Sequence, residues 1–232
     1  PNFFNDGVIR KDLLGAGLGG QLAFAYFGEL KEELEERRLH HQDYQPYVHP
    51  FAPFISLENL WGQILPSQKV NLDRFLSGEK EMTPDAFQLL VDLYLGESTF
   101  PPHMVREYLL FQEKHYQWVQ PDPALSRRNL GLFHAASLED WFGPKFVELA
   151  AQFVINGAKI AKERGYKVSY EEAKVALFKN GQKAAETQMR KEKVSDEEMG
   201  KLWHDVLLYL GMNEKEMVSL WQEVMLFRRL FD

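Results

Sequence analysis

The last third of the chain contains three signals that start helices, and each is followed by an amphipathic pattern. Ser169, Ser195 and Asn213 each stand three residues before a glutamate, where a capping side chain can accept a hydrogen bond from the amide at the third helical position. For the two serines, we expect the glutamate to bond back and close a capping box. Apolar residues then recur at steps of three and four, as in Met199, Leu202, Trp203, Val206, Leu207 and Leu210, and in Met217, Leu220, Trp221, Val224 and Phe227. This region therefore folds as short, separately capped helices, and each has an apolar face to bury.

Helical patterns dominate the rest of the chain, and few runs alternate as strands do. We therefore predict an all-α, irregular multi-helix fold. The expected helices cover 11–40, 57–64, 68–76, 83–95, 101–118, 124–135 and 144–164, with a turn or short helix from 137 to 143.

The charge balance changes near residue 143. Residues 1–142 carry 12 basic and 20 acidic side chains, whereas 143–232 carry 15 and 14. We predict an acidic helical region over 1–143 and a second helical region over 144–232. Whether the two pack as one domain stays open.

Composition excludes several classes of site. The chain has no cysteine, so disulfides, thiol catalysis and cysteine-based zinc sites are excluded. No basic patch stands out, so we expect no nucleic-acid partner. The most apolar stretch, residues 13–28, is interrupted by Gln21 and is shorter than the roughly 20 residues of a spanning helix, so we expect no membrane span.

Two motifs have a chemical and a structural interpretation. Residues 15–20 match GxGxxG. A nucleotide site requires a buried strand before this motif, and none precedes it here. We interpret Gly15, Gly19 and Ala23 as a small-residue strip that lets another helix approach, from this chain or from a partner. A second motif joins possible metal ligands, but a solvated helix end is the better interpretation of His40, His41, Asp43 and His49.

No serine–histidine–aspartate signature, phosphate-binding loop or paired-carboxylate motif occurs in the chain. We therefore predict no catalytic residue, no cofactor and no metal, and no enzymatic activity. An unrecognised helical enzyme is the remaining alternative.

The segment 42–54 interleaves aromatic residues with three prolines and is expected to be extended. It either packs on the core of its own domain, or it lines a groove or reaches a protein partner, and a stiff arm loses little entropy when it docks. The candidate partner-binding residues are Tyr44, Tyr47, Phe51 and Phe54. A second aromatic group is expected in the core: Phe100, Tyr108, Phe111, Tyr116 and Trp118.

Residues 144–231 resemble the N-terminal chaperone region of the peptidyl-prolyl isomerases related to SurA, PpiD and trigger factor. The resemblance lies in a long helix, the turn GYKVSYEEAK at 165–174, the spacer EKVSDEEM at 192–199 and two last helices ending in VMLFRRL at 224–230. It implies a periplasmic or otherwise extracytoplasmic holding chaperone that binds unfolded or secreted polypeptides through apolar surface. No part of this chain resembles the catalytic isomerase module of that family, and residues 1–143 depart from the family pattern. The alternative is a scaffold or assembly subunit with a fixed partner, which could form a homo-oligomer.

Overall fold

The computed structural model describes residues 4–39, 44–77, 81–190 and 193–232, and leaves the side chains of Ala23, Phe24, Leu39 and Gln188 undescribed. The predicted all-α class is confirmed: within these ranges the regular elements are helices, and an isolated bridge between Val48 and Ser56 is the nearest approach to a strand. No helix in these ranges combines the length and apolarity needed to cross a bilayer.

Contacts divide the chain into two compact units, residues 1–150 and 151–232. The division falls inside the helix α8. That the chain has two domains with a boundary near residue 143 stays a prediction. The elements of the first unit are η1 (Asn5–Leu14), α2 (Gly19–Leu39), α3 (Leu57–Ile64), α4 (Pro66–Leu76), α5 (Pro84–Thr99), α6 (Pro102–His115), η3 (Leu132–His134), α7 (Leu138–Phe142) and the start of α8 (Pro144–Glu163).

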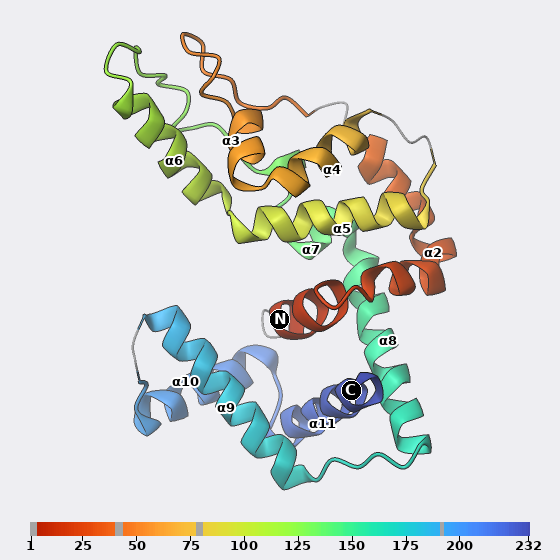
Figure 1. The fold of residues 1–232 in the computed structure, drawn as a ribbon. Coiled ribbons are helices and arrows are strands. Elements are labelled where there is room, and N and C mark those ends of the chain that lie inside the picture. The colour runs from red at the N-terminus through yellow and green to blue at the C-terminus, as the bar shows by residue number, and fades with distance from the viewer. Residues whose placement is uncertain (1–3, 40–43, 78–80, 191–192) are drawn as a thin grey trace. The chain divides into compact units, whose positions relative to one another are not determined.

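Helix α5 forms the centre of the first unit, with α2 and α4 packed against it (Figure 1). Thr83 caps α5, since its hydroxyl accepts a hydrogen bond from the Ala86 amide at 3.1 Å. Phe87 of α5 is fully buried, and its ring centroid lies 5.6 Å from that of Phe142 in α7. The core of this unit is therefore apolar and rich in aromatic rings.

The predicted continuous helix over 11–40 is wrong at its start. A π-helix ends at Leu14, Gly17 adopts a φ of +76°, and α2 begins only at Gly19. Glycine adopts this conformation without the steric cost that a Cβ adds, and it interrupts the helix. A Cβ on Gly19 would lie 3.3 Å from Val91 of α5, so a helix of this chain makes the close approach there. Gly15 and Gly19 consequently do not share one helix face.

The helix predicted near 124–135 is also wrong. A turn covers 123–127 and irregular backbone follows it up to η3, where Phe133 and His134 have positive φ angles that a regular helix does not adopt. Helix α6 ends at His115, earlier than the predicted Trp118.

The second unit contains the rest of α8 with α9 (Tyr170–Met189), α10 (Asp196–Leu210) and α11 (Glu214–Phe231). Helices α9 and α11 pack side by side (Figure 1). Phe227 of α11 contacts Phe153 of α8 at 5.9 Å between ring centroids and lies against Gly157. Gly165, with a φ of +87°, follows the end of α8 as predicted.

All three predicted caps are present in the second unit, but the boxes differ from the prediction. Ser195 and Asn213 form complete capping boxes with Glu198 and Glu216. Ser169 accepts from the Glu172 amide at 3.1 Å, whereas the Glu172 carboxylate accepts from Arg229 of α11. A charged partner across the unit thus replaces the local back-bond. The predicted burial of the α10 face is incomplete, because no residue of α10 is fully buried.

Candidate functional site

Two irregular segments of the first unit contact each other: the first loop, 44–56, leads into α3, and the second loop, 116–131, follows α6 (Figure 1). The first closes on itself, because the Leu57 amide donates to the Tyr47 carbonyl at 2.8 Å and the His49 amide donates to the Ile55 carbonyl at 2.9 Å. The proline-rich segment is therefore a hydrogen-bonded loop rather than a free arm.

His49 joins this loop to α6. Its Nδ1 accepts hydrogen bonds from the Phe51 and Ala52 amides, both at 3.1 Å, so the ring proton lies on Nε2 and donates to Glu113 Oε1 at 3.1 Å. The same Glu113 oxygen accepts from the Asp122 amide. His49 is 0% exposed and Glu113 is nearly buried, so this polar group lies in the interior and is satisfied.

The four predicted partner-binding residues separate into two pairs. Tyr47 is buried and Tyr44 is half-buried, and both line a hollow. Phe51 and Phe54 are exposed on the outer side of the loop. Whether any of the four binds a partner stays a prediction.

Phe54 belongs to a group of touching rings that we call the aromatic surface, made of Phe54, Phe111, His115, Tyr116 and Trp118. The Phe54 centroid lies 4.9 Å from that of Tyr116 and 6.0 Å from that of Trp118. His115 lies 5.3 Å from Tyr116 and stacks on Phe111 at 6.2 Å.

The prediction that Phe111 and Trp118 are core residues is wrong. Phe111 is 65% exposed and Trp118 is 69% exposed, whereas Phe100, Tyr108 and Tyr116 are half-buried. Large apolar rings gathered on a surface mark an interaction site more often than rings scattered singly.

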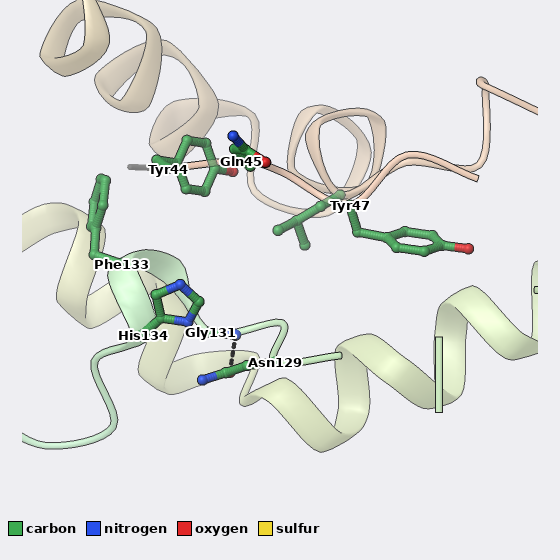
Figure 2. Close-up of a pocket in the computed structure, with 8 residues that line it drawn as sticks. Tyr44, Gln45, Tyr47, Asn129, Gly131, Phe133 and His134 are labelled. Atoms are coloured by element: carbon green, nitrogen blue, oxygen red, sulfur yellow. Dashed lines mark hydrogen bonds between the residues drawn. The ribbon is translucent and has the colours of Figure 1, made fainter. Parts of the chain in front are cut away.

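The hollow shown in Figure 2 has a volume of about 130 Å³. Tyr44 and Phe133 lie at one end of it, 5.3 Å apart between centroids, and Tyr47 lies at the other. The lining residues are Tyr44, Gln45, Tyr47, Leu57, Asn129, Gly131, Phe133 and His134. Asn129 Oδ1 accepts from the Gly131 amide at 2.9 Å and fixes this turn.

The turn beside the hollow is strained and rests on a buried acid. Phe133 and His134 have φ angles of +50° and +58°, which are unfavourable for bulky side chains. Glu97 of α5 accepts from the Leu132 amide at 2.6 Å and so holds the start of the turn. Burial raises the pKa of Glu97 to about 8, so its carboxyl group is mainly protonated at neutral pH.

Both tyrosine hydroxyls near the hollow stay protonated at neutral pH. Burial raises the pKa of Tyr44, and the negative charges of Glu58 and Asp73 raise it further. Burial also raises the pKa of Tyr47, with Asp122 as the next cause, although the ring of Tyr47 lies under the Arg128 guanidinium.

The hollow is a weak candidate for a ligand site. Its volume is below the roughly 300 to 1,000 Å³ of small-molecule pockets, and no carboxylate, lysine or arginine lines it. A second hollow of about 230 Å³ shares Phe133 and is bordered by Arg37, Asp140 and Trp141. It too is below that range, so the aromatic surface is the stronger candidate.

Of the four residues considered as metal ligands in the sequence, only His49 lies among the described residues. His40, His41 and Asp43 lie outside them, and both ring nitrogens of His49 are engaged in hydrogen bonds. Elsewhere in the described ranges, no three histidine, aspartate or glutamate side chains gather as metal ligands.

Sequence reasoning missed Glu97 and the His49–Glu113 pair. The signal for Glu97 was its place in the apolar run LLVDLYLGE, where a carboxylate on a buried helix face needs a partner. For His49 no signal was available, since its partner is 64 residues away.

A family model described as "Conserved hypothetical protein CHP03076, glycine cleavage" matches residues 1–231. Neither a curated protein nor a solved structure matches the chain significantly. The match overturns the resemblance to SurA-like isomerases, because it covers the whole chain, including residues 1–143 that the resemblance left unexplained. The predicted holding-chaperone function is therefore wrong: the capped, amphipathic helices that suggested it are general features of helical proteins.

Proposed function

This chain belongs to the glycine cleavage family just described, and we propose that it is a non-enzymatic accessory protein of glycine cleavage. In this proposal it binds another protein of that process through the aromatic surface. The observation that carries the proposal is the set of mutually touching rings of Phe54, Tyr116 and Trp118, of which Phe54 and Trp118 are exposed and Tyr116 is half-buried. The periplasmic location rested on the overturned resemblance and stays an untested prediction, as does a homo-oligomer.

The chemistry of these rings supports a protein as the ligand. Phenylalanine, tyrosine and tryptophan are enriched in the centres of protein interfaces, where they bury large areas and lose little conformational entropy because they have few rotatable bonds. Trp118 and Phe111 leave most of their side chains in water, so covering them would remove apolar area from solvent. Exposed side chains of this kind suit contact with another protein surface better than enclosure of a small molecule, which needs a concave pocket.

The partner we propose presents an apolar patch bordered by arginine or lysine. Residues 1–142 carry eight more acidic than basic side chains, a balance that attracts a basic partner and speeds its encounter. Exposed tryptophan and tyrosine faces also attract arginine and lysine side chains. Binding should therefore weaken as the salt concentration rises.

The test uses the full chain and each glycine cleavage protein encoded in the same genome, purified separately. Isothermal titration at low and at physiological salt should identify one that binds. Phe54→Ala combined with Trp118→Ala should weaken that binding at least about tenfold, as expected for central interface rings. Tyr209→Ala is the matched control, because Tyr209 is an exposed aromatic residue in α10, outside the aromatic surface. No binding by any of these proteins, or equal affinity of the double variant, would contradict the proposal.

A further inference from the structure

We infer that His49 is a positioning residue of the aromatic surface, and that with Glu113 it holds the two loops that carry Phe54 and Trp118 in the arrangement the partner binds. This inference rests on the proposed function, since it concerns how the same surface is made ready for binding. His49 is fully buried and cannot touch the partner itself.

The buried side chains of His49 and Glu113 connect three stretches of backbone: the first loop, α6 and the second loop. His49 Nδ1 holds the Phe51 and Ala52 amides of the first loop, and Nε2 reaches Glu113 on α6. Glu113 Oε1 then holds the Asp122 amide, which lies four residues beyond Trp118 in the second loop. Phe54 lies three residues beyond Phe51 in the first loop.

The rings that touch across the two loops depend on this connection. Phe54 comes from the first loop, whereas Tyr116 and Trp118 come from the chain that follows α6. These ring contacts require that the first loop stays in place beside the segment that carries Tyr116 and Trp118. A binding surface ordered in advance loses less conformational entropy when the partner arrives.

The hydrogen-bond roles can be separated by substitution. Asparagine at position 49 offers an acceptor near the place of Nδ1 but does not extend to Glu113, so His49→Asn keeps the turn and removes the link. Glu113→Gln keeps a carbonyl oxygen that can accept from both His49 and the Asp122 amide, so it retains the link without the charge. Glu113→Ala removes the link from the other side.

The experiment measures the affinity of His49→Asn, Glu113→Ala and Glu113→Gln for the glycine cleavage protein that binds the unaltered chain. It also measures acrylamide quenching of Trp118, taken as the difference between each protein and its Trp118→Phe counterpart. We expect His49→Asn and Glu113→Ala to weaken binding about tenfold or more, as for loss of an interface hot spot, and to change Trp118 quenching. Glu113→Gln should remain within about twofold of the unaltered chain in affinity, because both hydrogen bonds can persist.

Cooperative thermal unfolding of each variant, followed by circular dichroism, separates positioning from loss of the fold. Unchanged affinity and quenching in folded His49→Asn would overturn the inference. Equal weakening by Glu113→Gln and Glu113→Ala would also overturn it, since the charge and not the link would then matter. If no glycine cleavage protein binds the unaltered chain, the proposed function fails, and Trp118 quenching alone decides whether His49 positions the loops.

Discussion

Single buried polar residues organise the irregular half of the first unit. Glu97 accepts a hydrogen bond from the Leu132 amide, just before two residues with positive φ, and His49 accepts hydrogen bonds from two amides of its own loop. Neither loop has a helix or sheet ladder to satisfy its backbone, so these side chains take that role. The geometry of the hollow and of the aromatic surface therefore depends on a few side chains.

Glu97 makes the stability of the protein depend on pH. Its pKa is about 8 in the folded chain against an ordinary value of 4.5, so between these values the unfolded chain releases a proton that the folded chain keeps. Its contribution is fully present below pH 4.5 and is lost as pH rises through 8. Glu97→Gln keeps an acceptor for Leu132 and cannot ionise. The free energy of unfolding of the variant, relative to the unaltered chain, should therefore rise by up to about 5 kcal/mol from low to high pH.

Urea unfolding of both proteins at several pH values across this window checks the prediction. A difference in free energy of unfolding that does not change with pH would show that Glu97 does not titrate as its burial requires.

At the scale of elements, the sequence predicts best what neighbouring residues determine. Ser169, Ser195 and Asn213 cap helices as their spacing indicates, because a cap bonds within the same turn. The same spacing cannot reveal that Glu172 pairs with Arg229, which is 57 residues away and is brought close only by packing. The break before α2 was missed for a related reason, since helix periodicity continues across the glycines.

Two glycines near that break should respond oppositely to alanine. Gly17 has a φ of +76°, so Gly17→Ala should destabilise the protein by about 1 to 2 kcal/mol. Gly28 lies exposed within α2 and an added Cβ there meets no atom within 4 Å, so Gly28→Ala should stabilise by about 0.5 to 1 kcal/mol. Thermal unfolding monitored by circular dichroism measures both. A stabilising Gly17→Ala would show that α2 continues through this position.

At the scale of the whole molecule, the all-α class followed from the sequence, but the function did not. Capped amphipathic helices occur in many helical proteins, so the pattern over 144–231 suggested a chaperone that the family match excludes. Phe51 and Phe54 of the predicted aromatic segment are exposed, whereas Tyr47 is buried and Tyr44 is half-buried. Composition identifies such a segment, but only the fold determines which rings remain in water.

The most direct test of our account is amide hydrogen exchange of the full chain, with and without the glycine cleavage protein that binds it. The proposal predicts slower exchange in the complex over two stretches that carry the aromatic surface, 50–58 and 108–120. The exposed helix α10 should exchange equally in both states. Protection confined to α9, α10 or α11, with no change around Phe54 and Trp118, would contradict the central claim that the aromatic surface is where the partner binds.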